Sequence, residues 1–293
     1  MTDTRAPATP ATAAPARRRM SRRAALAVAG CAAGGAATYA CWNTLRLNVS
    51  RRRIALSRLP AAFEGLTVAF LADFHHSLCV PLSLIRDAAA LAMSARPDLV
   101  LLGGDFITGR RRYAAPCIAA LGGLAAPFGV FAVLGNHDHG AGERAVRAEL
   151  ARRGIRELFN AGVWLERGGA RLRLGGVGDL WRATQDLPAA LGDVRAGEGA
   201  LVLTHNPDFA EEIESDGVDL LLAGHTHGGQ AVLPLAGAPF TPSRYGEKYR
   251  EGLARGPKCL VYVTRGVGTS ALPVRIGCPP EVSVLELVRA PEN

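Results

Sequence analysis

Histidine and aspartate side chains gather in short clusters along the chain, and each cluster follows a run of apolar residues. One cluster, GHTHGG, places His225 and His227 one residue apart directly after the run that ends at Ala223. A buried strand has no need of two imidazoles at its end, so these side chains indicate ligands for a metal ion. Four further clusters supply Asp73 with His75, then Asp105, then Asn136 with His137 and Asp138, and finally His205.

The residue types in these clusters define the kind of metal. They combine hard oxygen donors with imidazole nitrogens and contain no thiolate, which suits Mn, Fe, Zn or a similar divalent ion. On an extended segment alternate residues point the same way, so Asp73 and His75 are expected to face one site. Asp105 has two carboxylate oxygens, enough to bridge two cations. Seven candidate ligands exceed the needs of one tetrahedral zinc and predict two divalent metal ions with open positions for water and substrate.

The order of the clusters resembles that of the calcineurin-like metallophosphoesterase superfamily. The superfamily pattern is D-x-H, G-D, G-N-H-D/E, a lone H and G-H-x-H, and all five blocks occur in this order over residues 73–227. The resemblance implies two metal sites that share one bridging aspartate. The first site consists of Asp73, His75, Asp105 and His227, and the second of Asp105, Asn136, His205 and His225.

The resemblance also implies a reaction and a fold. A hydroxide held between the two metals attacks phosphorus in line, while the metals offset charge on the phosphoryl oxygens. His137, which is not a ligand, stabilises the transition state or protonates the leaving oxygen, and Asp138 orients its ring. The implied fold is a four-layer α/β/β/α sandwich, in which two mixed sheets are flanked by helices.

A closer likeness is to the exported or membrane-associated bacterial branch of this superfamily. It is carried by segments such as LPAAFEGLTVAFLADFHHS, TPSRYGEKYREGL and PVRIGCPPEVSVLEL, and it covers most of residues 59–289. The branch implies hydrolysis of a phosphodiester or pyrophosphate on an envelope or lipid-linked substrate. For some members it implies UDP-2,3-diacylglucosamine, in lipid A biosynthesis. Phe74 stands where the branch usually has leucine, which affects no catalytic position.

Other functions remain open at this point. A phosphomonoesterase uses the same chemistry, and a catalytically silent binding or scaffold protein can use the same fold. Scaffolds of this kind lose ligands, whereas none is missing here, so the ligand set favours an enzyme. The candidate substrate contacts are His139, Arg265, Arg275 and Tyr245. Each of these side chains could instead pack against its neighbours or lie in solvent.

The apolar runs before the clusters predict the elements that position them. Strands are expected at 66–72, 98–104, 129–135, 200–205, 218–225, 259–266 and 282–288, and helices at 81–95, 114–123 and 141–154. Continuous apolar strands that alternate with helices indicate sheets covered by helices. The later strands lie closer together in sequence, which indicates a second, mixed sheet. Ligands in such folds collect at the carboxyl ends of strands, where every cluster falls.

Charge separates an N-terminal leader from the body of the chain. Residues 1–53 contain ten arginines and one acid, whereas the remaining 240 residues contain 24 basic and 25 acidic residues. The near-neutral body argues against nucleic acid as a partner. We predict a disordered basic leader with a twin-arginine element at 1–23, a signal or membrane-anchor segment at 24–42, a linker at 43–64 and the metallophosphoesterase domain at 65–290.

The leader predicts where the body is located. Ser21-Arg22-Arg23 before a weakly apolar segment resembles a signal for the twin-arginine export machinery. Cleavage after Ala40, lipidation of Cys31 and retention of 24–42 as a membrane span all fit the sequence, and all place the body at the extracytoplasmic face. A cytoplasmic disordered tail is the alternative. An exported location conflicts with cytoplasmic hydrolysis of UDP-2,3-diacylglucosamine.

Export would also permit disulfide bonds. The cysteines of the body follow no metal-binding spacing, and the sequence does not assign a pairing among Cys79, Cys117, Cys259 and Cys278.

Overall fold

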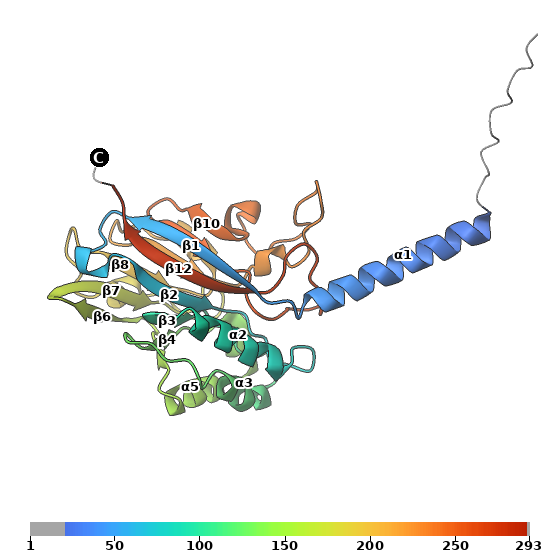
Figure 1. The fold of residues 1–293 in the computed structure, drawn as a ribbon. Coiled ribbons are helices and arrows are strands. Elements are labelled where there is room, and N and C mark those ends of the chain that lie inside the picture. The colour runs from blue at the N-terminus through green and yellow to red at the C-terminus, as the bar shows by residue number, and fades with distance from the viewer. Residues whose placement is uncertain (1–20, 292–293) are drawn as a thin grey trace, which may run out of the picture. The chain divides into compact units, whose positions relative to one another are not determined.

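The computed structural model describes residues 21–291, and it divides into two compact units, 1–38 and 39–293 (Figure 1). Helix α1 (Arg22–Asn43) supplies the described part of the first unit, and its last residues belong to the second. Among the helices of residues 21–291, none combines the length and the apolar character that crossing a membrane requires. Of the disordered leader predicted at 1–23, residues 1–20 lie outside the described residues, and Arg22 and Arg23 belong to α1.

The second unit contains two six-stranded mixed sheets, with strand orders β1-β12-β2-β3-β4-β5 and β10-β11-β9-β8-β7-β6. The strands of the first sheet are β1 (Asn48–Leu56), β2 (Leu66–Leu71), β3 (Leu99–Leu102), β4 (Val130–Ala132), β5 (Arg156–Glu157) and β12 (Glu281–Arg289). Those of the second are β6 (Ala161–Arg167), β7 (Ala170–Gly176), β8 (Ala200–Leu203), β9 (Leu220–Ala223), β10 (Gly252–Arg255) and β11 (Leu260–Val263).

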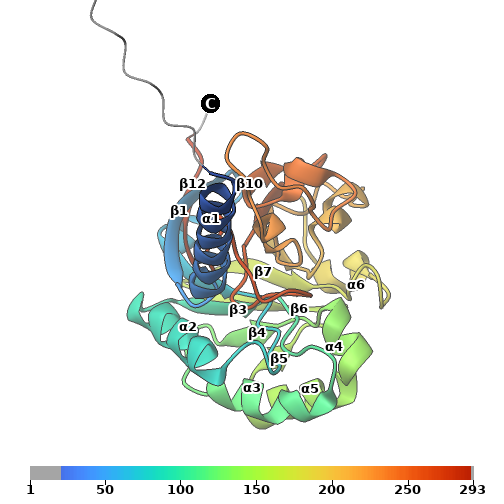
Figure 2. The same ribbon diagram turned by 90° about the vertical axis from the view of Figure 1, so that its right-hand side faces the viewer.

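Helices cover the outer faces of the two sheets. Figures 1 and 2 show α2 (Leu82–Ser94), α3 (Ala114–Ala120) and α5 (Glu143–Arg152) along one face of the first sheet. On the second sheet, α6 (Leu187–Leu191) packs against β6 and β7. The short helix α4 (Asn136–Ala141) follows β4. This arrangement confirms the predicted α/β/β/α sandwich.

Alternation along the strands explains how the layers are held together. In β2, Val68 and Phe70 belong to the apolar cluster between the two sheets, whereas Ala69 and Leu71 belong to the cluster beneath the helices. A third cluster joins the second sheet to α6. Because both faces of such strands are buried, they appear in the sequence as continuous apolar runs. The strands predicted at 66–72, 98–104, 129–135, 200–205, 218–225, 259–266 and 282–288 are therefore confirmed, as are the helices at 81–95, 114–123 and 141–154, with small differences at their ends.

The prediction of a linker over the whole of 43–64 is wrong, because Asn48–Leu56 form strand β1. This strand pairs in parallel with β12 from Asn48 opposite Glu281 to Leu56 opposite Arg289. It is the edge strand of the first sheet and leaves Arg51–Arg53 exposed. Its polar residues therefore do not form the apolar run by which the other strands were predicted. Charged edges of this kind discourage pairing with another chain.

The hairpin of β6 and β7 was not predicted either. Its turn contains Gly168 and Gly169, both with positive φ, as a two-residue hairpin turn requires. In β7 arginines alternate with leucines, and β6 ends in the charged residues Glu166 and Arg167, so the pair lacks the long apolar runs of the other strands.

All six cysteines are free thiols, and Cys79, Cys117, Cys259 and Cys278 form no disulfide with one another.

Candidate metal centre

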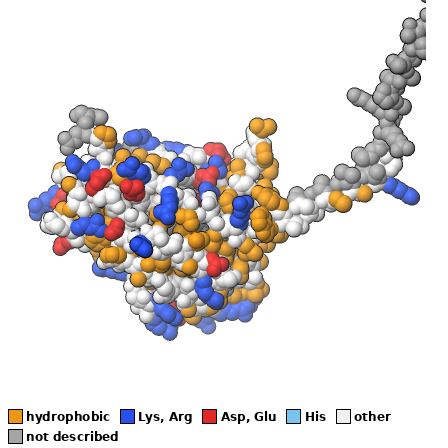
Figure 3. Space-filling view, in the orientation of Figure 1, with side chains coloured by type: hydrophobic (Ala, Val, Ile, Leu, Met, Phe, Trp, Pro, Cys, Tyr) orange, Lys and Arg blue, Asp and Glu red, His pale blue; other side chains and the backbone are white. Residues whose placement is uncertain are grey.

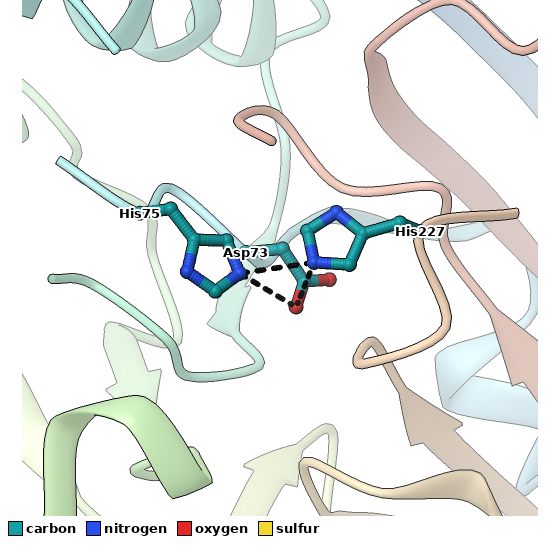
Figure 4. A group of neighbouring side chains, drawn as sticks. All are labelled: Asp73, His75 and His227. Carbon is teal, nitrogen blue, oxygen red and sulfur yellow. Dashed lines mark hydrogen bonds and ion pairs between the residues drawn. The ribbon is translucent and has the colours of Figure 1, made fainter. Parts of the chain in front are cut away.

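The clusters predicted from the sequence converge at one edge of the two sheets, beyond the ends of β2, β3, β4, β8 and β9. Figure 4 shows three of the side chains, which come from the segments after β2 and β9. His75 Nε2 lies 2.9 Å from His227 Nε2. Asp73 Oδ1 lies 3.9 Å from His75 Nε2 and 3.7 Å from His227 Nε2. These three donors surround one point, as ligands of a single cation do.

Asp105 lies between this group and a second one. Its Oδ2 is 3.5 Å from His75 Nε2 and 3.1 Å from His205 Nε2. On the far side, His225 Nδ1 is 3.3 Å from His205 Nε2. The Asp105 carboxylate therefore contacts histidines of both predicted ligand sets, which is the position that a shared ligand requires.

Unpartnered polar atoms test whether cations fit this site. Asn136 Oδ1 and His225 Nε2 are buried and have no hydrogen-bond partner in the described residues. A buried polar atom in that condition costs about 1–3 kcal/mol. The facing nitrogens of His75 and His227 can share at most one proton between them. Divalent cations satisfy nitrogen and oxygen donors of this kind, so the residues present fit the predicted metals.

The backbone at the site departs from the geometry that the sequence indicated. Five candidate ligands have left-handed φ values: 56° at Asp73, 46° at His75, 55° at Asp105, 71° at His225 and 53° at His227. The prediction that Asp73 and His75 lie on an extended segment is wrong, because the chain leaves the strand conformation before it reaches them. Such strained backbone is concentrated at functional sites. Here it turns consecutive donors toward one point.

Burial determines the charge of these side chains. It lowers the pKa of His75 to about 3 and that of His225 to about 3, so both imidazoles are neutral, the form that binds a metal. Burial raises the pKa of Asp73 to about 7. For Asp105 and His205 burial opposes ionisation, but their mutual attraction outweighs it, which lowers the pKa of Asp105 and raises that of His205.

These pKa shifts predict a pH-dependent metal affinity. Below about pH 7 the metal-free Asp73 holds a proton that a cation must displace, so we expect Mn²⁺ to bind at least about tenfold more tightly at pH 8 than at pH 6. Because the pKa of Asp73 is raised by folding, its contribution to the stability of the metal-free fold is present at low pH and is lost as the pH rises through about 7. Calorimetric titration in buffers of different ionisation enthalpy measures both affinity and proton release. An affinity that does not change with pH would contradict the prediction.

His137 lies beside both groups, close enough to His75 and Asp105 that these three side chains could also surround a cation. Its backbone N–H donates to Asp105 Oδ1 at 2.9 Å, and its ring is edge-on to His75 with centroids 4.8 Å apart. The predicted contact between Asp138 and this ring is wrong. Asp138 Oδ1 accepts the Ile107 N–H and Oδ2 accepts the Gly135 N–H, each at 3.1 Å. Asp138 therefore joins the segments after β3 and β4, and burial raises its pKa to about 7.

The four predicted substrate contacts lie outside the lining of the cavity described below. Arg275 is a clear correction, because its guanidinium is fully buried and donates to backbone carbonyls rather than to solvent or substrate. Arg265 forms ion pairs with Glu251 and Glu281. His139 Nδ1 lies 2.9 Å from a carboxylate oxygen of Glu143, and Tyr245 packs edge-on against Tyr249. Substrate contact by Arg265, His139 and Tyr245 stays a prediction.

Two residues at the site were missed. The Trp181 ring stands edge-on to His225 with centroids 4.3 Å apart, and it is half-exposed. Asp179 is fully buried, and its Oδ1 accepts the Trp181 N–H at 3.0 Å. The sequence contained a signal for Asp179, because a Gly-Asp pair follows β7 as another follows β3. It was overlooked because β7 itself was not recognised.

A cavity of about 440 Å³ opens onto these residues. Asp105, His137 and three other polar residues of the site form its floor. The rest of the lining is largely apolar and forms a wall that includes Trp181, Phe240, Pro242, Leu272 and Val274. The cavity therefore offers a polar, metal-binding floor beside a wall suited to an apolar group.

Comparison with known proteins places the site in a family. Residues 66–229 match the family described as Calcineurin-like phosphoesterase. The chain is 40% identical over 242 residues to Phosphodiesterase YaeI of Escherichia coli (strain K12), which covers 81% of this chain and 87% of that protein. It is 31% identical over 282 residues to Uncharacterized metallophosphoesterase YkuE of Bacillus subtilis (strain 168), which covers 92% of this chain and 98% of that protein.

Among solved structures, the crystal structure of TT1561 of Thermus thermophilus matches with a TM-score of 0.47 and 13% identity, over 69% of this chain and 90% of that one. The family match covers more than half of the chain, and its span contains all five clusters of the site. The chain therefore belongs to the calcineurin-like phosphoesterase family, and it is a metallophosphoesterase.

Proposed function

We propose that the enzyme is a phosphodiesterase with two divalent cations, and that its substrate carries an apolar group next to a phosphodiester or pyrophosphate, as an envelope or lipid-linked compound does. The observation that carries this proposal is the cavity, which joins the metal-binding floor to the apolar wall formed by Trp181, Phe240 and Leu272. The name of the Escherichia coli relative supports a diester over a monoester.

The distances among Asp73, His75, His227, Asp105 and His205 support the proposed ligand sets, and Asn136 is included because its Oδ1 is buried without a partner in the described residues. Asp73, His75 and His227 would hold one cation, His205, His225 and Asn136 the other, and Asp105 would contact both. Bound there, the cations would activate water and offset the negative charge of the phosphoryl group.

The side chains of this protein carry out the remaining steps. In hydrolysis the water oxygen forms a bond to phosphorus while the bond from phosphorus to the leaving oxygen breaks. His137 lines the cavity next to Asp105, where its ring can give a proton to that leaving oxygen. The apolar wall binds the apolar group and excludes water from one side of the cavity.

A series of substrates tests the apolar group. With Mn²⁺ present, alkyl p-nitrophenyl phosphodiesters of increasing chain length are expected to give KM values that fall with length, because each added methylene is buried against the wall. In Trp181→Ala and Phe240→Ser this dependence should weaken, whereas p-nitrophenyl phosphate, which lacks the alkyl group, should be a poor substrate throughout. A KM independent of chain length, or a preference for the monoester, would contradict the proposal.

His137→Ala tests proton donation. We expect kcat to fall about 10²–10⁴-fold for a diester with a poor alkyl leaving group. The loss should be smaller for bis-p-nitrophenyl phosphate, because p-nitrophenolate leaves without needing a proton. Metal content, measured by mass spectrometry, should remain that of the wild type. Equal losses on both substrates would indicate that the ring acts on charge or position instead of donating a proton.

We also propose that the protein is exported through the twin-arginine route. The support is sequence alone, namely the Ser21-Arg22-Arg23 element before a weakly apolar segment. Cell fractionation of Arg22→Lys/Arg23→Lys is the test, and accumulation of this variant in the cytoplasm is expected. An unchanged distribution between the cell fractions would contradict the proposal.

A further inference from the structure

Several exposed apolar side chains lie on loops that line or adjoin the metal cavity. Leu235 stands completely in solvent at the tip of a turn in which the Leu233 N–H donates to the Gly237 carbonyl at 2.8 Å. Leu78 is 87% exposed and Leu272 is 65% exposed. Figure 3 shows hydrophobic side chains gathered at the right-hand end of the body, including the upright loop at its upper right. An apolar patch of this kind marks a surface that meets another surface.

Hydrogen bonds join two of the loops that carry these side chains. The Gln230 side chain donates to the Ser270 carbonyl at 3.1 Å and to the Leu272 carbonyl at 3.0 Å, and it accepts the Ser270 N–H at 2.9 Å. Both loops also line the metal cavity, through Phe240 on one and Leu272 on the other. The exposed apolar groups therefore form the rim of the cavity on this side.

Two further segments continue the rim. Leu45 and Cys79 line one small crevice together with Thr269 of the same loop. The Asn43 side chain donates to the Arg275 carbonyl at 3.1 Å, which fixes this segment to the other end of that loop. We call the resulting surface the docking face, and its apolar members are Trp42, Leu45, Leu78, Leu235, Phe240 and Leu272.

Basic side chains adjoin the docking face. Arg110, Arg111 and Arg112 are all exposed, and none forms an ion pair with an acidic residue within 21–291. The segment that carries these arginines begins at the metal site, where Thr108 Oγ1 lies 2.6 Å from His75 Nδ1. Its backbone continues beside the segment of Leu78, because the Thr108 N–H donates to the His76 carbonyl at 3.3 Å. Apolar and cationic groups thus share the surface around one entrance.

We infer that the docking face binds the surface of an anionic phospholipid bilayer, with its leucines in the acyl boundary and Arg110–Arg112 against lipid phosphates. In that orientation the metal cavity opens toward the headgroup layer. The inference rests on the proposed function for its substrate class, because a lipid phosphodiester would then reach the cavity without leaving the bilayer. The charge of the rim favours this partner over a neutral apolar surface.

Vesicle binding by the full chain tests the docking face. The variant Leu78→Ser/Leu235→Asn removes two exposed leucines that do not line the cavity, and asparagine tolerates the left-handed φ of 67° at position 235. We expect its affinity for phosphatidylglycerol-containing vesicles to fall at least about tenfold. The matched control, Phe159→Ser/Leu253→Ser, removes two exposed apolar side chains of the body that lie outside the docking face, one between β5 and β6 and one on β10, and should bind as the wild type does.

A charge variant separates lipid phosphate from general apolar adhesion. Arg110→Gln/Arg111→Gln/Arg112→Gln should abolish the preference for phosphatidylglycerol over phosphatidylcholine vesicles. Turnover of soluble bis-p-nitrophenyl phosphate should be the same in all these variants, because none changes the cavity.

Three outcomes would overturn the docking face. The first is equal vesicle affinity of the two double variants, and the second is a wild type that hydrolyses the soluble diester but binds no vesicles. The third is self-association in solution that Leu78→Ser/Leu235→Asn abolishes, because this would assign the face to a second copy of the chain. A wild type that binds vesicles as expected but hydrolyses no diester would instead overturn the proposed function.

Discussion

Asp105→Asn is expected to lower kcat for a diester by about 10³-fold, the scale of losing several kcal/mol of transition-state charge stabilisation. Asparagine keeps the shape of the side chain and can still accept the His137 N–H, but it loses the charge. In the wild type the carboxylate lies 3.5 Å from His75 Nε2 and 3.1 Å from His205 Nε2, so one substitution weakens both metal positions. We therefore also expect bound metal to fall well below two ions per chain.

Asp219→Asn is the matched control for this prediction. The Asp219 side chain is also nearly buried, but it lies at the start of β9, whereas the candidate ligands His225 and His227 follow the end of that strand. Its Oδ1 accepts a hydrogen bond from Arg58 at 2.8 Å, so the substitution should lower stability without changing kcat or metal content. Steady-state kinetics with mass-spectrometric metal analysis measures both. If Asp105→Asn keeps two metals and activity within about tenfold of the wild type, Asp105 does not bridge them.

The convergence of the candidate ligands on one site could be predicted from the sequence because these residues follow strands that are buried on both faces. Such strands need continuous apolar runs, and the polar residues at their ends then stand out, as His225 and His227 do after Ala223. The local geometry could not be predicted in the same way. The left-handed backbone at Asp73 and Asp105 lies where the segments after β2 and β3 hydrogen-bond to each other, and the residue types at these positions do not predict it.

The roles of polar side chains away from the strand ends were harder to predict. Asp138 was expected to contact the His137 ring, but the N–H groups of Ile107 and Gly135 compete for its oxygens and bind them. Strand β1 was missed because an edge strand needs only one buried face and can carry three consecutive arginines. Trp181 was missed because its loop follows β7, a strand without a continuous apolar run.

The role of Arg275 could not be predicted either, since the sequence does not show that this arginine is fully buried. Its Nη2 donates to the carbonyls of Arg265, at 2.8 Å, and Gly268, at 2.5 Å. Its Nη1 donates to the carbonyl of His227 at 3.3 Å. No carboxylate pairs with it in the described residues. The guanidinium therefore acts as a common donor that joins the loop of Arg265 and Gly268 to the backbone of the candidate ligand His227.

Arg275→Met is consequently expected to destabilise the metal-free enzyme by about 3–5 kcal/mol, because several buried carbonyls lose their donor at once. Arg275→Lys should lose nearly as much, since an ammonium lacks the planar fork that reaches carbonyls on different segments. Urea unfolding with a chelator present measures this without a contribution from bound metal. Arg53→Met is the control: it removes an exposed arginine paired with Glu286 at 3.3 Å, and its effect should stay below about 1 kcal/mol. If Arg275→Met unfolds at the same urea concentration as Arg53→Met, the buried guanidinium does not hold the loop. The backbone around His227 must then be fixed by its other contacts, such as the Cys278 thiol 3.2 Å from the His227 carbonyl.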